Sequence, residues 1–335
     1  MRKYLLPQKN TYKANLHAHS LGSDGEMPPE VMRDEYKKRG YSVLSITEHE
    51  RLIDYTYLDQ DDFLFINGYE MSINEQADGD WDENKCCHLN LYTKNPHDTR
   101  QVHFHPQDIW YTDGVGETIE YFGEADDKKD YTAECINQII VDAKSHDFIV
   151  CLNHPCWSLQ TAQDVAQYDG LYAMEVFNTD NVYNGFSEYN LAMYESMVRA
   201  GKRIAMQMAD DNHNHSKSDV FGGSFGGYDM IRADSLEYSS IINALEKGDF
   251  YCSQGPEIKD VYVQDGKVHI TCSNAKEIYL ATGIRRCRVA RAKKGEYINS
   301  ASFDIVDKMR YIRLEVVDEN QKSAYTRAYF TDEWQ

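Results

Sequence analysis

Histidine pairs separated by a single residue are the first feature of this sequence that could do chemistry. Twelve histidines occur in 335 residues, and they form three such pairs, more than chance placement would give. His17 and His19 end an apolar run, whereas His103 and His105 lie in a polar stretch. Position relative to the apolar runs therefore separates candidate ligands from surface histidines better than the pairing itself.

Nine side chains that could bind metal ions lie on or just after apolar runs. They are six imidazoles and three carboxylates. Each of these side chains alone would be an ordinary capping or surface group. If they all lie in one place without metal, however, the repulsion between the acids and the burial of unpaired imidazoles would cost much free energy. The sequence therefore predicts a metal site. The predicted ligands are His17, His19, Asp24, His49, Glu70, His88, His154, Asp211 and His213.

The mixture of donors indicates which ions would bind. Imidazole with carboxylate suits Zn, Mn or Fe better than Ca or Mg, which prefer oxygen ligands. Nine ligands exceed the needs of one ion, so we expect two or three divalent ions that share at least one carboxylate. Three ions would bring more positive charge than Asp24, Glu70 and Asp211 cancel, and this excess would attract an anionic substrate.

The elements that must position these residues follow from the hydrophobic pattern. Short apolar runs alternate with amphipathic segments through the first three quarters of the chain, which is typical of α/β proteins with parallel strands. We expect strands over 12–17, 42–47, 63–70, 87–92, 148–153, 171–177 and 203–209, and helices over 28–39, 133–145, 187–200 and 235–247. A parallel barrel places the carboxyl ends of its strands on one rim, where the nine ligands would meet.

The chain has two expected regions and one expected insertion. The stretch 93–131 is polar, acidic and too long for an ordinary connection, so we interpret it as an insertion that could lie over the site. Beyond residue 255, short alternating runs with turn signals predict a small all-β module. We therefore expect a barrel domain over 1–255 and an all-β, sandwich-like domain over 256–335.

Composition excludes several classes of protein. No stretch approaches the roughly 18 apolar residues of a membrane span, and no secretion signal is visible at the start. The eight cysteines form no CxxC pair and lack the spacing of a zinc ribbon, so we expect free thiols. Free thiols are typical of a reducing compartment, and we therefore expect a cytoplasmic protein. The formal charge of −20 disfavours duplex nucleic acid as a partner. The oligomeric state stays open.

As a set, the motifs resemble the polymerase-and-histidinol-phosphatase (PHP) superfamily of metal-dependent phosphoesterases. The resemblance implies a distorted (β/α)7 barrel. It also implies three metal positions, held by His17, His19, Glu70 and Asp211, by Glu70, His88 and His154, and by Asp24, His49 and His213. The chain departs from the family pattern at Glu48 and Asp210, which neighbour ligands without replacing one. The matching motifs are HAHSLGSDG at 17–25, ITEH at 46–49, GYE at 68–70, His88, NHP at 153–155 and DNH at 211–213.

The C-terminal region, with DFYCSQGPEI ahead of the β module, resembles a branch of this superfamily that includes carbaryl-hydrolase-like enzymes. The resemblance to that branch implies an ester of a carboxylic or carbamic acid as an alternative substrate class.

The expected activity is hydrolysis of a small phosphomonoester by hydroxide that bridges the ions of a di- or trinuclear site, because coordination makes water acidic enough to attack at neutral pH. Asp211, Glu70 and His213 are the predicted catalytic residues. Arg51, Lys85 and Arg232 are candidate phosphate-binding cations.

Two alternatives stay open. The ions could polarise the carbonyl of a carboxylic or carbamic ester, in which case the pocket should be apolar rather than cationic. A non-catalytic binding protein is the third hypothesis, although the presence of all nine ligands argues against it.

Overall fold

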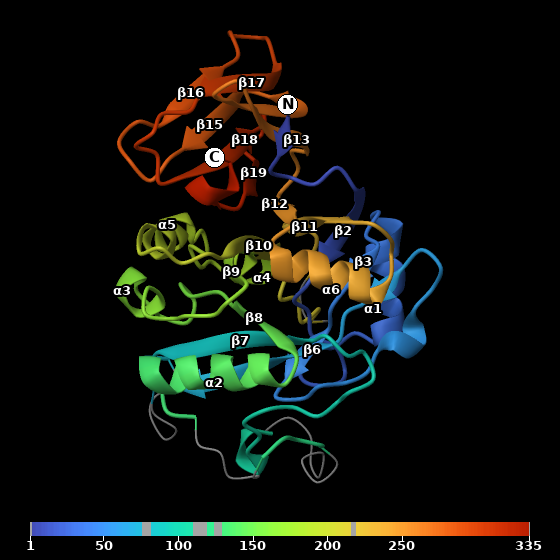
Figure 1. The fold of residues 1–335 in the computed structure, drawn as a ribbon. Helices are drawn as coiled ribbons and strands as arrows, with labels where there is room; N and C mark the ends of the chain where they lie inside the picture. The colour runs from blue at the N-terminus through green and yellow to red at the C-terminus, as the bar shows by residue number, and fades with distance from the viewer. Residues whose placement is uncertain (1, 76–81, 110–118, 124–128, 216–218, 335) are drawn as a thin grey trace.

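The computed structural model describes residues 2–75, 82–109, 119–123, 129–215 and 219–334 and combines extensive sheets with few helices (Figure 1). One of the sheets has six strands. Its strands, in the order β10-β9-β8-β7-β6-β4, are Ala205–Ala209, Ala173–Asn178, Phe148–Leu152, Cys86–Thr93, Gly68–Asn74 and Thr47–His49.

A longer sheet of ten strands runs from the C-terminal region into the N-terminal half. Its main path has the order β16-β15-β18-β19-β12-β11-β2-β3-β5, and β20 (Tyr329–Phe330) pairs with β18 off this path. The strands of the path are Arg288–Arg291, Glu277–Ala281, Tyr311–Val317, Ser323–Thr326, Phe250–Ser253, Tyr228–Ala233, Asn10–Asn15, Val43–Leu44 and Leu64–Phe65.

The six-stranded sheet is connected to the ten-stranded sheet at both of its edges, near β4 and near β10. The chain passes directly from β3 into β4 and from β5 into β6, so each of these predicted strands is split between the two sheets. At the other end, the backbone after β2 meets the backbone after β10. Asp211 N donates to His17 O at 2.8 Å, and His19 N donates to Asn212 O at 3.1 Å.

All seven predicted strands are present, but their expected parallel arrangement is wrong at β7. This strand pairs antiparallel with both β6 and β8, whereas β8, β9 and β10 are mutually parallel. The short connection over 75–85 explains the β6–β7 pair, because adjacent antiparallel strands need only a hairpin, whereas parallel strands need a long crossover. The antiparallel direction brings the first residues of β7 to the rim where the neighbouring strands end.

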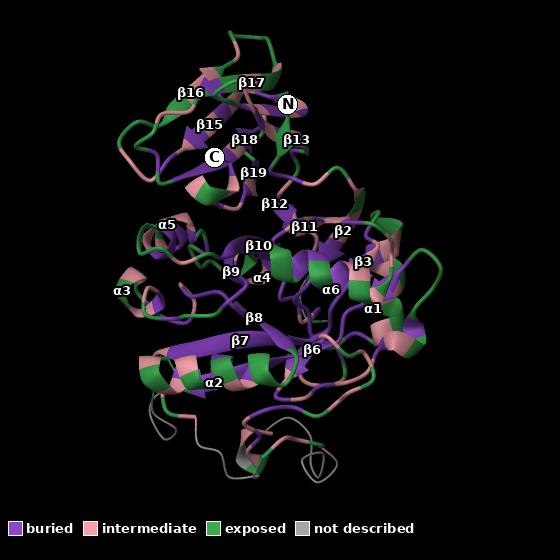
Figure 2. Ribbon diagram, in the orientation of Figure 1, coloured by how far each residue is buried: buried purple, intermediate pink, exposed green. Residues whose placement is uncertain are grey.

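The four predicted helices are present with shifted bounds, as α1 (Pro29–Lys38), α2 (Ala133–Ser145), α5 (Leu191–Arg199) and α6 (Tyr238–Lys247). In α2, Ile136, Ile139, Ile140 and Ala143 recur with helical spacing and are buried, while Figure 2 shows the opposite face exposed. The short helices α3 (Ala162–Val165) and α4 (Thr179–Tyr183) were not predicted. Three 3-10 turns complete the described helical segments, Thr56–Leu58, Pro106–Asp108 and Thr331–Glu333.

The described elements after residue 255 are strands, apart from the 3-10 turn at Thr331–Glu333. β13 (Ile258–Gln264), β14 (Lys267–Ala275) and β17 (Ile298–Asp304) form a four-stranded sheet with the N-terminal strand β1 (Lys3–Tyr4). The other C-terminal strands extend the large sheet through β12 and β19, where Tyr251 is in register with Thr326. A buried ion pair also joins the regions, because Arg313 Nε lies 3.0 Å from Glu195 Oε1 on α5. The domain boundary at 255 stays a prediction.

The eight cysteines are free thiols in this structure, and five of them are buried. Among the described residues, the helices are too short or too polar to cross a bilayer.

Candidate metal centre

The structure brings all nine predicted ligands to one rim, although they come from six separate segments. His17, His19 and Asp24 follow β2, His49 ends β4, and Glu70 lies in β6. His154 follows β8, and Asp211 and His213 follow β10. His88 is the third residue of β7, and it reaches the same rim because that strand runs in the opposite direction.

Glu70 lies at the centre of the cluster and is fully buried. One carboxylate oxygen, Oε1, lies 3.0 Å from His154 Nε2 and 3.1 Å from His88 Nδ1. The other, Oε2, lies 3.2 Å from His49 Nδ1 and 3.3 Å from the Nε2 atoms of both His17 and His19. A single carboxylate thus contacts five of the six imidazoles.

Two groups of side chains have ligand atoms within 4.8 Å of one another. One consists of His17, Glu70, His154 and Asp211, and the other of His19, Asp24, His49 and His213. This grouping differs from the one that the family resemblance implies, because His19 falls with Asp24 rather than with His17. His88 belongs to neither group but contacts Glu70 directly.

The donor set fits divalent metal ions. Glu70 Oε2 and His19 Nδ1 are buried and make no hydrogen bond among the described residues, a costly state unless another group binds them. The 3.0–3.3 Å separations around Glu70 also match ligand atoms on a shared ion, since bonds of about 2.1 Å at octahedral to tetrahedral angles leave ligands about 3.0–3.4 Å apart.

Without ions, the cluster holds protons in their place. Burial favours the neutral imidazole of His17, but the nearby carboxylates of Asp211 and Glu70 outweigh it and raise its pKa well above the usual range. The same balance raises the pKa of His19 to about 10. Burial and then the positive charge of His19 lower the pKa of His49 to about 3. Metal ions would therefore have to displace protons from this cluster.

Glu175 is a buried residue of the site that sequence reasoning missed. Its Oε1 lies 2.7 Å from His17 Nδ1, on the ring edge opposite the nitrogen that faces Glu70, and its Oε2 accepts from His154 N. A carboxylate in this position fixes the tautomer and orientation of a ligand histidine. The signal was present in the sequence, because Glu175 is an acid inside the apolar strand AMEVFN.

Glu48 and Asp210, the two departures from the family pattern, are buried and hold loops at the rim. Glu48 accepts from Tyr55 Oη at 2.6 Å and from the hydroxyls of Ser20 and Ser23, so it fixes the loop that carries Asp24. Asp210 accepts from Tyr36, Thr179, Phe225 N and Gly226 N and so holds the glycine-rich loop after the site.

Amide and hydroxyl side chains satisfy further ligand atoms. Asn153 donates to Glu70 Oε1 at 2.8 Å, and Asn178 donates to Asp211 Oδ2 at 3.1 Å. Ser158 Oγ lies 3.2 Å from His154 Nδ1, so the other ring nitrogen faces Glu70. These contacts pre-orient the ligands before any ion binds.

An aromatic side chain adjoins the cluster. The Trp157 ring centroid lies 5.0 Å from that of His154 and 5.3 Å from that of His88. Its backbone N–H is held by the buried Glu188 carboxylate at 2.7 Å. The β7–β8 side of the site therefore includes an apolar surface.

The three predicted phosphate-binding cations have different positions. Arg51 follows the ligand His49 by two residues, and its side chain has no ion-pair partner among the residues described. Lys85 is paired with Asp164 at 2.8 Å. Arg232 is in register with Thr11, near the start of β2, and donates to Thr11 Oγ1 and to the Ile258 and Lys259 carbonyls. The structure does not bring Arg232 to the cluster, which follows the other end of β2.

Part of the predicted insertion lies beside the site, while 110–118 and 124–128 fall outside the described residues. Lys129 is buried, with its Nζ 2.8 Å from Glu50 Oε2 and 2.7 Å from Asp108 Oδ2. Glu50 directly follows His49 and has a positive φ of 52°. The end of the insertion is therefore attached to the turn that carries a predicted ligand.

Comparisons with known proteins give only distant similarities. No protein-family model and no curated protein matches the chain. One similar solved structure, from Bacteroides vulgatus, is described as a two-domain protein containing a predicted PHP-like metal-dependent phosphoesterase. It is 15% identical, with a TM-score of 0.45, over 97% of this chain and 98% of that one.

Another similar structure, from Bifidobacterium adolescentis, is described as a candidate metal-dependent phosphoesterase. It is 13% identical, with a TM-score of 0.38, over 62% of this chain and 89% of that one. Both likenesses are too weak to support a functional conclusion, so the function is inferred from the geometry of the cluster.

Proposed function

We propose that the protein is a metal-dependent hydrolase that cleaves a small phosphomonoester. The observation that carries this proposal is the buried Glu70 carboxylate, which contacts five imidazoles and keeps one oxygen without a hydrogen bond. A carboxylate in this position could bind two ions at once, one through each oxygen. Glu70 belongs to one of the two ligand groups and contacts His19 and His49 of the other.

The protein residues have distinct roles in this proposal. Divalent Zn, Mn or Fe ions would supply acidified water and neutralise the phosphoryl oxygens. Glu70 and Asp211 would hold the ions together, since Asp211 Oδ1 lies 3.1 and 3.0 Å from the Nε2 atoms of His17 and His19. His213 Nε2, 3.4 Å from Asp24 Oδ2, would hold the outer part of the site.

The number of ions decides which substrates the site attracts. Besides Asp24, Glu70 and Asp211, the carboxylate of Glu175 lies within 4 Å of a ligand imidazole. Two divalent ions would balance these four negative charges, whereas three would leave an excess of positive charge. A compact anion is therefore the expected substrate of the trinuclear form, while the acidic chain disfavours duplex nucleic acid.

A carboxylic or carbamic ester is the second candidate substrate, and Trp157 favours it. The indole ring lies against His88 and His154, where an apolar acyl or leaving group could pack. Of the three candidate cations, Lys85 is paired with Asp164 and Arg232 lies away from the cluster, so phosphate binding would rely on Arg51, which follows the predicted ligand His49 by two residues.

The fold and location that accompany this function are also proposals. We infer that the two linked sheets represent the distorted seven-stranded barrel of the PHP superfamily, with residues 256–335 as an accessory β domain. The closure of the backbone after β2 against the backbone after β10 supports the barrel. A cytoplasmic location agrees with the eight free thiols.

A substrate panel tests the function. Metal-reconstituted protein should hydrolyse phosphomonoesters with a higher kcat/KM than aryl carbamates, naphthyl esters or oligonucleotides, and inorganic phosphate should inhibit it. Arg51→Gln should raise KM for the phosphomonoester, whereas Lys85→Gln, which removes a cation paired with Asp164, should not. Faster cleavage of a carbamate or naphthyl ester than of every phosphomonoester would favour the second candidate.

A further inference from the structure

A cavity of about 680 Å³ lies at the opposite end of the strands from the metal cluster. Its lining includes the first residues of β8 and the segments that lead into β9 and β10. The predicted ligands follow the other ends of β8 and β10, and a five-residue strand spans roughly 17 Å. The volume lies in the range of small-molecule sites, about 300–1,000 Å³, and the cavity is separate from the proposed active site.

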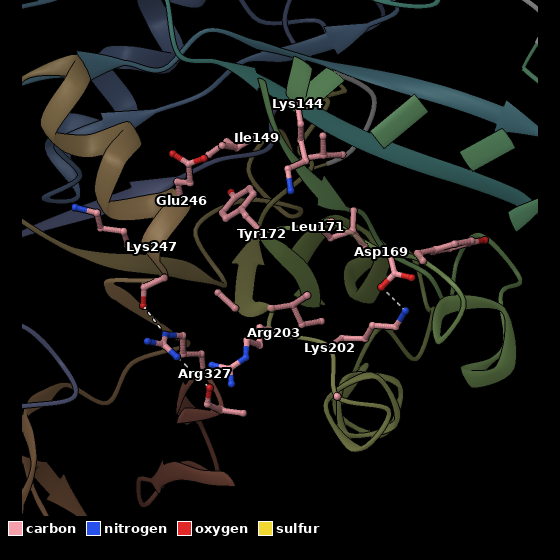
Figure 3. A pocket seen from close by; sticks show the side chains of 18 of the residues that line it. Lys144, Ile149, Asp169, Leu171, Tyr172, Lys202, Arg203, Glu246, Lys247 and Arg327 are labelled. Atoms are coloured by element: carbon pink, nitrogen blue, oxygen red, sulfur yellow. Dashed lines mark hydrogen bonds and ion pairs between the residues drawn. The ribbon is translucent and has the colours of Figure 1, made fainter. Parts of the chain in front are cut away.

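The cavity has an excess of positive charge in a chain whose formal charge is −20. Three carboxylates line it, Asp169, Glu246 and Glu333, against five cations. Figure 3 shows the cations on several sides of Tyr172, with Lys144 across the cavity from Arg203 and Arg327. The five cations are Lys144, Lys202, Arg203, Lys247 and Arg327.

Three of the five cations are already neutralised within the protein. Lys202 pairs with Asp169, Arg203 pairs with Asp332, and Arg327 makes a two-pronged contact with Glu333. Among the described residues, Lys144 and Lys247 form no close ion pair, and Lys247 feels the Asp249 carboxylate only at longer range. Glu246, which adjoins Lys247 in sequence, is paired with Lys94 instead.

The two remaining lysines lie at helix ends that the backbone already caps. Lys144 and Lys247 lie in the last turns of α2 and α6, where a cation also stabilises the negative end of a helix. The chain itself satisfies carbonyls at these ends, because His146 N bonds to the last turn of α2 and Gly248 N to that of α6. Arg327 Nε also donates to Gly248 O at 3.1 Å. The two ammonium groups are therefore available to a ligand.

Two glycines hold the backbone close to the cavity's cations. A Cβ at Gly248 would lie 2.7 Å from Arg327 Cδ, and one at Gly170 would lie 3.5 Å from Lys144 Nζ. Both glycines have positive φ, 69° and 89°. Between the cations, the apolar side chains of Leu171, Tyr172 and Ile204 contribute to the wall.

From the charge, the volume and the apolar wall, we infer that this cavity binds a small organic phosphate. Lys144 and Lys247 supply the charge for the phosphate group, and the apolar wall contacts the organic part. The ligand does not reach the metal cluster, so it acts as an effector and not as a substrate of that site.

Calorimetric titration of the metal-loaded, full-length protein with inorganic phosphate, the minimal probe, tests this inference. Wild type should show a binding event that is lost or about tenfold weaker in Lys144→Ala/Lys247→Ala, as expected when two exposed cationic contacts are removed. The control Lys293→Ala/Lys294→Ala removes the same charge from an exposed loop of the C-terminal region and should bind phosphate as wild type does.

A Glu70→Ala variant separates this cavity from the metal cluster, which would also bind phosphate as a product. We expect Glu70→Ala to retain the binding event that depends on Lys144 and Lys247. Equal phosphate binding by wild type and by Lys144→Ala/Lys247→Ala would overturn the inference. A folded Glu70→Ala protein that binds no phosphate would also overturn it. If Glu70→Ala does not fold, the comparison of wild type with Lys144→Ala/Lys247→Ala is the deciding test.

Discussion

The two ends of strands β8, β9 and β10 carry charge in contrasting ways. At the carboxyl ends, Glu70 and Asp211 are buried against imidazoles with almost no access to water. At the amino ends, the ion pair of Lys202 with Asp169 is largely exposed, with 70% of the Asp169 side chain accessible. Burial makes the first arrangement costly to leave without a partner, whereas solvent screens the second. The strands thus separate a buried cluster whose charges need a partner, either protons or ions, from a cavity whose charges solvent can screen.

The largest expected effect is at the buried end. Glu70→Ala should lower bound metal by more than one equivalent and reduce kcat/KM at least about a hundredfold, because the residue contacts both parts of the cluster. His17→Ala should lose less metal. Elemental analysis and steady-state kinetics measure both, with the exposed Glu296→Ala as control. Full metal content in Glu70→Ala would exclude a bridging role.

Glu175→Gln should have the next largest effect. The amide keeps the shape of the side chain but removes the charge beside His17 Nδ1, and metal affinity should fall about 10- to 100-fold, as for other groups that orient ligand histidines. Competition with a chelating dye measures this affinity. Exposed Glu134→Gln on α2 serves as the control, and an unchanged affinity in Glu175→Gln would show that Glu175 does not position His17.

The pH dependence of the metal-free protein gives a third test. The pKa of His19 is raised from its usual 6.5 to about 10, so its contribution to stability is complete below pH 6.5 and is lost as the pH rises to about 10. The thermal midpoint of chelator-treated protein should therefore fall across this window. Metal-loaded protein should not show this fall, because ions replace the protons. If the thermal midpoints of the metal-free and metal-loaded proteins change with pH in the same way, metal ions do not replace protons in the cluster.

The smallest effect is expected at the exposed end. Lys202→Ala removes the ion pair with Asp169, and we expect the free energy of unfolding to change by about 0.5 kcal/mol or less, as for other surface pairs. Denaturant unfolding measures this change, and activity should stay at the wild-type level. A loss above about 2 kcal/mol would mean that this pair is not screened as its exposure indicates.

The sequence predicted where the candidate ligands gather better than it predicted the connections between the elements that carry them. Position after an apolar run identified His154 and Asp211, because strand ends meet at one rim whatever the details of pairing. The same rule selected His88, although β7 is antiparallel and His88 lies near its start. Strand direction depends on long-range pairing, which local pattern does not report.

The missed and misplaced residues have related causes. Glu175 was overlooked because one acid inside an apolar run is ambiguous until its neighbour, here His17, is known. Arg232 was selected for its place after a glycine-rich stretch, but β11 runs antiparallel to β2 and carries Arg232 away from the rim. For both residues, the position relative to the cluster depends on contacts with distant segments of the chain, which the local sequence pattern does not show.

The pairing of the first strands with late segments has a consequence for synthesis of the chain on the ribosome. β2, which leads to His17 and His19, pairs early with β3 but also needs β11, and β1 pairs with β13, so each of these N-terminal strands has a partner that follows it by more than 200 residues. Asp211 and His213 arrive equally late. A nascent chain can therefore expose its first histidines to cellular ions but cannot complete either ligand group. Metal binding at the proposed site would therefore come late in synthesis, after β11 has paired with β2.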